Sequence, residues 1–306
     1  MSDDMMFSIR VPASTANLGP GFDSIGLALS LYLTVHVYRS NEWIVEPLSK
    51  EMEAFPKDDH HYIIKIAKKV AAKYGQTLPT CRLGVHSEIP LARGLGSSAS
   101  AIVAGIQLAD TLCKLHLSTD EKIHLASSEE GHPDNAGASV TGGLVVGEYS
   151  EDCTHLLSFP LRDVEVVAVI PNYELLTSDS RSVLPSVFSY KESVQASSIA
   201  NMFLAALLSK NYSLAGKMMK RDHFHQPYRR KLVPLLDEVE EMAEAAGAFG
   251  VALSGAGPTV VCFAEGKNVD VLVKKLSERF VDCTIKALPI DEDGCVVMSN
   301  ADLVQV

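Results

Sequence analysis

The chain has 306 residues, of which 47% are apolar and 21% charged, and its formal net charge at pH 7 is −11. This length predicts two domains, and the acidic balance argues against a nucleic-acid-binding protein, which usually carries a basic face. Apolar runs stay shorter than the about eighteen residues of a membrane span, because SIANMFLAALLS is interrupted by Asn201 and flanked by lysines, so no membrane span is expected.

The start of the chain and its cysteines both indicate a cytoplasmic protein. MSDDMMF is acidic, whereas a signal peptide begins with positive charge, so export is not expected. The six cysteines are scattered without a C-x-x-C pair. In a chain of this length we expect them to be reduced and mostly buried, as in a cytoplasmic protein.

The first half of the chain alternates between strand and helix patterns. YIIKIAKKVAAKYG repeats its apolar residues at three and four positions and ends on Gly75, as an amphipathic helix does. Ser118 and Glu121 have capping-box spacing at the start of another helix. The predicted strands cover residues 7–12, 27–39, 80–88, 142–149 and 164–171. The predicted helices cover residues 62–75, 98–115 and 117–130, the second being rich in small residues and therefore buried.

After Pro171, long helical patterns are followed by short strands. The predicted helices cover residues 193–211, 233–248 and 269–280. The predicted strands cover residues 249–255, 259–265, 282–290 and 294–299. This alternation predicts an α+β sandwich with a sheet on one side and helices on the other. With the boundary placed between Pro160 and Pro171, the two domains cover residues 1–165 and 166–306.

The stretch PLARGLGSSASA, residues 90–101, is nearly bare of large side chains just before a predicted helix. Gly94 and Gly96 permit tight turns and close approach to the main chain, and Ser97 and Ser98 offer hydroxyls. Unpaired N–H groups and the helix dipole favour an anion at such a position. The stretch is neither a Walker A motif nor a dinucleotide fingerprint, so it predicts a general anion-binding loop. A strand-to-helix turn with a serine N-cap is the alternative.

Residues 11–26, VPASTANLGPGFDSIG, form a turn-rich segment directly after a predicted strand. Loops at such positions often contact substrates, and Asn17 and Asp23 supply polar groups for that purpose. The alternative is a structural turn in which both side chains bond their own backbone.

Residues 127–143, SSEEGHPDNAGASVTGG, gather polar side chains at the end of a predicted helix. The carboxylates suit Mg²⁺, which prefers oxygen ligands. A zinc site on His132 and Asp134 is a weaker hypothesis, because no third soft ligand stands nearby at the usual spacing. A solvated, charged helix end is the alternative. The polar residues of this cluster are Glu129, Glu130, His132, Asp134 and Asn135.

ALSGAGPT, residues 252–259, is a second glycine loop after a predicted strand. Loops of this kind are common in hairpins, so it supports a ligand site only if it lies against the first glycine loop.

Arginines suit an amino-acid substrate, because a guanidinium fork pairs with a planar carboxylate through two hydrogen bonds. Surface positions are nevertheless the default for each arginine. His223 and His225 are expected to be solvated or core residues, and His60 and His61 to lie at the surface. The arginines considered are Arg181, Arg221, Arg229 and Arg230.

Together these stretches resemble the GHMP small-molecule kinases. PASTANLGPGFD near the start, PLARGLGSSAS at residues 90–100 and LSGAGPT near the end appear in the order of that family. The resemblance spans essentially the whole chain. Within the family, NLGPGFD, EGHPDNAG, SRSVLP and HQPYR resemble the branch that phosphorylates L-homoserine, whereas sugar- and mevalonate-phosphorylating members differ there.

The resemblance implies a two-domain α+β GHMP kinase fold. Its N-terminal domain is like the second domain of ribosomal protein S five, and its C-terminal domain is ferredoxin-like. The resemblance also implies that Ser98 and Glu130 hold Mg²⁺, with Glu129 as the nearby alternative. The cofactor-binding loop for the ATP phosphates consists of Pro90, Leu91, Ala92, Arg93, Gly94, Leu95, Gly96, Ser97, Ser98, Ala99 and Ser100.

The same resemblance assigns an acceptor site. Arg181 and Arg229 match the pair that holds the substrate carboxylate, and Gly257 and Thr259 close the site from the second domain. Asp134 stands where some members place a proposed catalytic base, but the homoserine branch is thought to manage without one, so Asp134 is expected to be structural or electrostatic. The positions that match contacts to the amino and hydroxyl groups are Asn17, Asp23 and Asn135.

The implied activity is ATP-dependent phosphorylation of the L-homoserine side-chain hydroxyl, giving O-phospho-L-homoserine, a step toward threonine. The cofactors are ATP and Mg²⁺, and the partners are small molecules, with no nucleic acid and no membrane. A homodimer is compatible with the sequence. Two alternatives are a kinase for another small alcohol, such as mevalonate, and a non-catalytic nucleotide or amino-acid sensor on the same fold.

Overall fold

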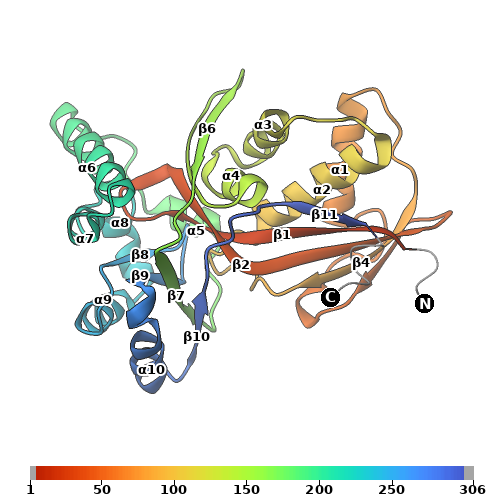
Figure 1. Ribbon diagram of the computed structural model, residues 1–306. Coiled ribbons are helices and arrows are strands. Elements are labelled where there is room, and N and C mark those ends of the chain that lie inside the picture. The colour runs from red at the N-terminus through yellow and green to blue at the C-terminus, as the bar shows by residue number, and fades with distance from the viewer. Residues whose placement is uncertain (1–4, 300–306) are drawn as a thin grey trace.

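The computed structural model describes residues 5–299, which form two sheets with helices packed on them (Figure 1). The first sheet has the strand order β11-β1-β2-β4-β3, and β5 pairs with β2 and with β6. Only β3 and β4 pair in parallel among these strands. The strands of this sheet are β1 (Met5–Asn17), β2 (Gly21–Arg39), β3 (Ile44–Pro47), β4 (Cys81–Ser87), β5 (Leu144–Tyr149), β6 (Thr154–Phe159) and β11 (Val296–Ser299).

The second sheet is antiparallel, with the strand order β10-β7-β9-β8. Its strands are β7 (Val164–Pro171), β8 (Gly250–Leu253), β9 (Val260–Glu265) and β10 (Cys283–Leu288). The helices that follow β7 in the chain are α5 (Thr177–Ser182), α6 (Tyr190–Leu208), α7 (Tyr212–Met219), α8 (Gln226–Arg229), α9 (Leu236–Ala245) and α10 (Val269–Arg279).

The helices of the first half pack on the first sheet around one apolar core. Small residues let α1 and α2 approach closely: a Cβ on Gly105 would lie 2.8 Å from the Ile63 carbonyl oxygen. The expected burial of α2 is therefore confirmed, and so is the capping box of Ser118 and Glu121 at α3. These helices are α1 (Tyr62–Lys73), α2 (Ser97–Cys113), α3 (Thr119–Glu130) and α4 (Asp134–Thr141).

The β1–β2 hairpin is longer than the sequence predicts and joins the two halves of the molecule. Residues 11–26 are expected to be turn-rich, yet β1 runs to Asn17 and β2 begins at Gly21. Register shifts at Pro12/Ala13 and Ala16/Asn17 let the pair bend while it stays hydrogen-bonded. In Figure 1 the hairpin, drawn in red, runs from the first sheet to the helices of the C-terminal half.

The last strand, β11, lies outside the sheet in which the sequence analysis places it. Residues 296–299 pair with β1, from Phe7↔Ser299 to Arg10↔Val296. The C-terminal half was expected to hold this strand, but sequence periodicity identifies a strand without identifying its partner. The boundary near residue 165 itself stays a prediction.

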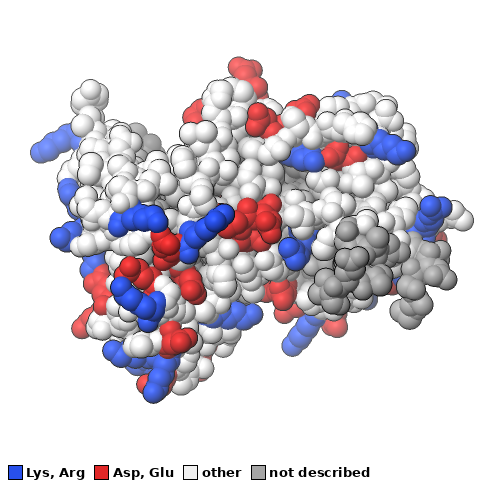
Figure 2. Space-filling model, viewed as in Figure 1, with Lys and Arg blue, Asp and Glu red and all other residues white. Residues whose placement is uncertain are grey.

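Surface charge and helix length relate to the two protein classes that the sequence argues against, nucleic-acid-binding proteins and membrane-spanning proteins. Figure 2 shows basic and acidic side chains interspersed over one face of the molecule. Among residues 5–299, no helix combines the length and the apolar character needed to cross a bilayer.

Candidate active site

A cavity of about 320 Å³ opens where the β1–β2 hairpin, the start of α2, the α3–α4 junction and the second glycine loop meet. Most of the residues singled out by the sequence line it. The lining residues are Ala16, Asn17, Asp23, Ala92, Gly94, Gly96, Ser97, Ser98, Ala99, Glu129, Glu130, His132, Asp134, Asn135, Leu175, Thr177, Arg181, Arg229, Gly255, Ala256 and Gly257.

The N-terminus of α2 faces this cavity and has no side-chain cap. Gly96 is the N-cap residue, with φ 71°, and no side chain within residues 5–299 caps the first turn. Ser97 and Ser98 form that first turn and line the cavity. Unpaired N–H groups at the positive end of a helix of this length favour an anion. The serine N-cap that was the alternative for this stretch is thus absent, because glycine holds that position.

The two glycines of the loop are required by the protein's own packing. Gly94 has φ 77°, and a Cβ there would lie 2.2 Å from the Ser254 carbonyl oxygen. A Cβ on Gly96 would lie 2.1 Å from the Ser14 Oγ. From the sequence, a bound anion is the only reason for the lack of large side chains in this loop. The structure adds a second cause, close contact between this loop and two other segments.

The second glycine loop lies directly against the first. The Ser254 Oγ donates to the Gly94 carbonyl at 2.5 Å, and the Thr259 N–H donates to the Arg93 carbonyl at 3.3 Å. The condition set for ALSGAGPT is therefore met. Gly257 lines the cavity, whereas Thr259 is fully buried and does not line it.

The remaining loop residues have other surroundings. The Arg93 side chain donates to the carbonyl oxygens of Leu91, Pro171 and Asn172, so it ties the loop to the C-terminal half. Leu95 is buried in the first core. Pro90 is half-buried and lines neither this cavity nor the second one described below.

Glu129 and Glu130 have different partners at the end of α3. Glu129 forms an ion pair with Lys69 at 2.5 Å. Glu130 lies beside the Ser98 hydroxyl, and burial raises the pKa of its carboxyl above the ordinary value. A half-buried carboxylate next to a hydroxyl supplies two oxygen donors of the kind that Mg²⁺ takes.

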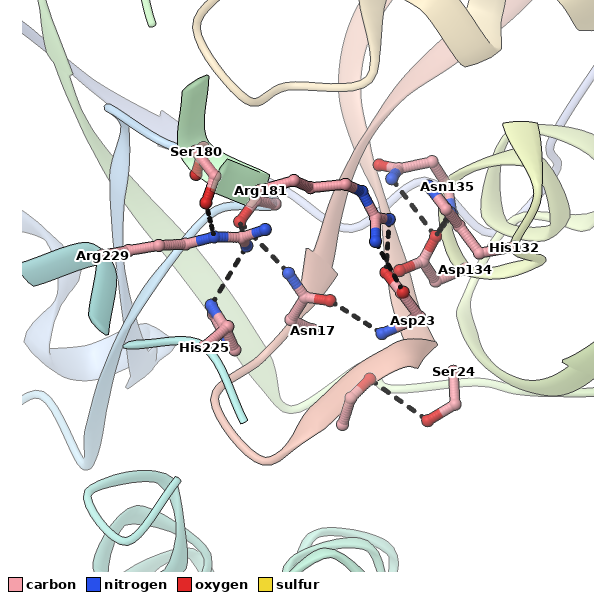
Figure 3. Close-up of polar contacts among 12 residues, drawn as sticks. Asn17, Asp23, Ser24, His132, Asp134, Asn135, Ser180, Arg181, His225 and Arg229 are labelled. Atoms are coloured by element: carbon pink, nitrogen blue, oxygen red, sulfur yellow. Dashed lines mark hydrogen bonds and ion pairs between the residues drawn. The ribbon is translucent and has the colours of Figure 1, made fainter. Parts of the chain in front are cut away.

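A tight polar cluster follows at the start of α4 (Figure 3). The His132 Nδ1 lies 2.6 Å from the Asp134 Oδ1, and the same oxygen accepts from the Asn135 N–H at 2.7 Å. Burial lowers the pKa of His132, but the hydrogen bond and charge of Asp134, with Glu130 and Asp23 nearby, raise it to about 9. Asp23 is close enough to join His132 and Asp134 as a third metal ligand, a residue that spacing along the sequence did not reveal.

The hairpin tip brings Asn17 and Asp23 to the C-terminal half. Asp23 accepts two hydrogen bonds from Arg181, at 2.8 and 3.0 Å, as Figure 3 shows. Asn17 accepts from the Asp23 N–H at 3.0 Å and donates to the Gly255 carbonyl at 3.1 Å. Both residues have a positive φ, 74° and 53°. Strained backbone of this kind concentrates at functional sites.

Arg229 is a buried cation, with 2% of its surface exposed, that still lines the cavity. Its Nε donates to the Ser180 carbonyl at 3.2 Å and its Nη1 to the Gly255 carbonyl at 2.9 Å. Burial and the charge of Arg181 lower the pKa of Arg229 to about 10. Arg221 and Arg230 do not line the cavity, which agrees with the default of a surface position.

A second, more apolar cavity of about 240 Å³ shares Ser97 and Ser98 with the first. His61 lines it and is only 4% exposed, so its expected surface position is wrong. The His61 Nδ1 accepts from the Ile63 N–H, which leaves the ring proton on Nε2. That Nε2 is buried and has no hydrogen-bond partner within residues 5–299. Only the fold, which turns His61 inward at the start of α1, reveals this position.

The comparisons with known proteins agree with this geometry. The GHMP kinases N terminal domain model matches residues 61–143, and the GHMP kinases C terminal model matches residues 203–282. The chain is 52% identical to a homoserine kinase of Bacillus velezensis, over 97% of this chain and 96% of that one. It is 50% identical to a homoserine kinase of Bacillus licheniformis, over 96% of each chain.

Solved structures give the same result. A candidate homoserine kinase from Listeria monocytogenes superposes with a TM-score of 0.83 at 40% identity, covering 95% of this chain and 99% of that one. A mevalonate kinase superposes with a TM-score of 0.70 at 20% identity, covering 94% and 99%, which shows the shared fold alone. The expected two-domain α+β GHMP kinase fold is confirmed, and the chain belongs to the homoserine kinase family of the GHMP kinases.

Proposed function

We propose that this kinase transfers the terminal phosphoryl group of ATP to the side-chain hydroxyl of L-homoserine. One observation carries the proposal: a single cavity joins an uncapped helix N-terminus to a set of charges that matches an amino-acid zwitterion. The helix N-terminus suits a phosphate, and one carboxylate facing two guanidinium groups suits an ammonium group and a carboxylate. The carboxylate is Asp23 and the guanidinium groups are those of Arg181 and Arg229.

The nucleotide is best placed across the boundary between the two cavities. Its phosphates fit at Ser97 and Ser98, which line both, and its adenine fits the apolar cavity behind them. The His61 Nε2–H, which is buried there without a partner in the described part of the chain, suits a ring nitrogen of a purine. Gly94 and Gly96 shape the turn that exposes the α2 amides to the phosphates.

Ser98 and Glu130 are the residues that would hold Mg²⁺. Glu130 fits this role better than Glu129, because Glu129 is neutralised by Lys69 whereas Glu130 lies beside the Ser98 hydroxyl. When bound, the ion neutralises charge on the phosphates and helps to orient them.

The acceptor is oriented by the residues at the hairpin tip. The zwitterion replaces the ion pair between Asp23 and Arg181, with its ammonium group on Asp23 and its carboxylate between Arg181 and Arg229. A neutral alcohol that displaced this ion pair would leave both charges without partners, whereas a zwitterion supplies an opposite charge to each of them. Asn135, held by Ser14 at 3.0 Å, directs the hydroxyl toward the nucleotide.

The chemistry then requires little beyond positioning. Phosphoryl transfer has a loose transition state, so aligned donors and neutralised charge supply most of the rate enhancement. The Asp134 Oδ1 is already engaged by His132 and by the Asn135 N–H. This supports a structural or electrostatic role for Asp134 in place of a base. Asp134 fixes Asn135, which in turn faces the substrate.

A coupled assay of ADP formation tests the proposal. ATP consumption that depends on L-homoserine, and that stops when EDTA removes Mg²⁺, is expected. Consumption with mevalonate but not with L-homoserine would contradict the substrate assignment. Nucleotide binding without transfer to any small alcohol would instead indicate a sensor on the same fold.

A further inference from the structure

The guanidinium group of Arg229 has most of its donors bound to the protein. Nε donates to the Ser180 carbonyl, and Nη1 faces both the Gly255 carbonyl and the His225 Nδ1, the latter at 3.3 Å (Figure 3). Within residues 5–299, Nη2 has no hydrogen-bond partner. Arg229 therefore offers a substrate the two N–H groups of one nitrogen in place of a complete fork.

His225, expected from the sequence to be a solvated or core histidine, adds a third contact that holds this orientation, beside those to Ser180 and Gly255. Its ring is completely buried, and its Nε2 lies 2.9 Å from the Gly19 carbonyl oxygen. A carbonyl oxygen only accepts, so Nε2 carries the ring proton. The Nδ1 is then a lone pair, the one form of the ring that can accept from the Arg229 Nη1. The ring thus connects the hairpin tip to the arginine by one donated and one accepted hydrogen bond.

Neighbouring contacts keep the ring in place. Asp222 accepts from the N–H groups of Phe224, His225 and Gln226, at 2.6 to 3.1 Å, and so holds the turn that precedes α8. Phe22 stacks on the His225 ring at 5.5 Å, and the Arg229 guanidinium lies over the same Phe22 ring at 5.3 Å. The Asp222 Oδ2 also lies 3.5 Å from the His225 Nε2, so the ring is contacted from the hairpin, from the turn before α8 and from Arg229.

We infer that His225 is a positioning residue for substrate recognition: by accepting from Nη1 it turns the free Nη2 of Arg229 toward the substrate carboxylate. This inference rests on the proposed function for the identity of the substrate. The arrangement of Arg229, by contrast, is independent of the proposed function. His225 touches no substrate itself, so its removal should act on L-homoserine binding while ATP binding is unchanged.

Three substitutions separate the two hydrogen bonds. In His225→Asn the side-chain oxygen can stand in for Nδ1, so the acceptor for Arg229 is kept. In His225→Gln the side-chain amide can stand in for the Nε2–H, so only the bond to Gly19 is kept. His225→Leu keeps neither. Thermal unfolding of all three variants shows which of them fold.

We expect His225→Gln and His225→Leu to raise the KM for L-homoserine about tenfold, the worth of one hydrogen bond to a charged group. The KM for ATP should not change, and His225→Asn should recover most of the affinity. In an Arg229→Leu background the same three substitutions should add nothing. Equal KM values in the Asn and Gln variants, or a parallel rise in the KM for ATP, would overturn the inference.

A measurement without substrate keeps this inference separate from the proposed function. In ¹⁵N-labelled protein, the Arg229 guanidinium signals should be resolved in the wild type and in His225→Asn, because rotation is hindered. They should average in His225→Gln. Resolved signals in all forms would overturn the positioning role of His225. If the wild type shows the expected pattern of signals but does not phosphorylate L-homoserine, only the substrate assignment is overturned.

Discussion

Replacing Gly94 by alanine tests whether the phosphate loop is held by contact with the second glycine loop. The new Cβ would lie 2.2 Å from the Ser254 carbonyl oxygen and 2.9 Å from that of Gly257, and these backbone atoms have to shift. The residue also keeps a φ of 77°, which disfavours a side chain. Left-handed strain of about 1 kcal/mol and overpacking of about 1 to 3 kcal/mol together predict a loss of about 2 to 4 kcal/mol in unfolding free energy.

Gly75→Ala is the matched control. Gly75 has φ 69°, and a Cβ there meets nothing within 4 Å, so this variant pays the strain alone, about 1 kcal/mol. Urea unfolding gives the two stability losses, and steady-state kinetics gives the KM for ATP. We expect Gly94→Ala to lose more stability than Gly75→Ala and to raise the KM for ATP about tenfold or more, while Gly75→Ala leaves the kinetics unchanged.

The outcomes distinguish the two reasons why the loop lacks large side chains, which are close approach of the phosphates and contact with the second glycine loop. If Gly94→Ala lost no more stability than Gly75→Ala but bound ATP poorly, close approach of the phosphates alone would explain the glycine. If the two variants agreed in both stability and the KM for ATP, the contact with Ser254 would not hold the loop, and the reasoning would be wrong.

Three further predictions concern the same cavity. Ser98→Ala and Glu130→Ala should lower kcat far more than they change the KM for L-homoserine, and Glu129→Ala, whose side chain pairs with Lys69, is the control for a lost carboxylate. Arg229→Leu should raise the KM for L-homoserine about tenfold or more, whereas an unchanged KM would remove this arginine from the carboxylate site. In metal-free protein, NMR titration should place the pKa of His132 near 9, above the usual 6.5, and Asp134→Asn should lower it. Because folding raises the pKa of His132, its protonated form stabilises the folded state, by about 3 kcal/mol at 1.36 kcal/mol per pKa unit. This contribution to the unfolding free energy is fully present below pH 6.5 and is lost as the pH rises through 9. An unfolding free energy of the wild type that does not decline over this range would contradict the prediction.

The chemistry of the site could be predicted from the sequence where it depends on local pattern. Gly94, Gly96 and the serines that follow them reveal a turn, an uncapped helix start and hydroxyls within a few residues of one another. The capping box of Ser118 and Glu121 is equally local. Such features are set by backbone dihedrals and short hydrogen bonds, so they survive in any fold that contains the segment.

Features that depend on distant partners could not be predicted. His61 and His225 are buried because segments far along the chain cover them, and no local pattern distinguishes them from exposed histidines. The third possible metal ligand beside His132 and Asp134 is Asp23, which lies on the hairpin. The length of that hairpin also escapes local reasoning, because glycine and proline at residues 19–21 indicate a turn while the flanking strands are set by pairing.

The pairing of β11 with β1 has a consequence for the order in which the molecule can be completed. Strand β1 lies second from the edge of the first sheet, and the edge strand beside it is β11, residues 296–299. During synthesis those residues leave the ribosome only after the entire second sheet has been made. Until then β1 presents an open edge, and open edges invite association with other chains. The C-terminal half of the polypeptide thus has to be synthesised before the sheet of the N-terminal half can be completed.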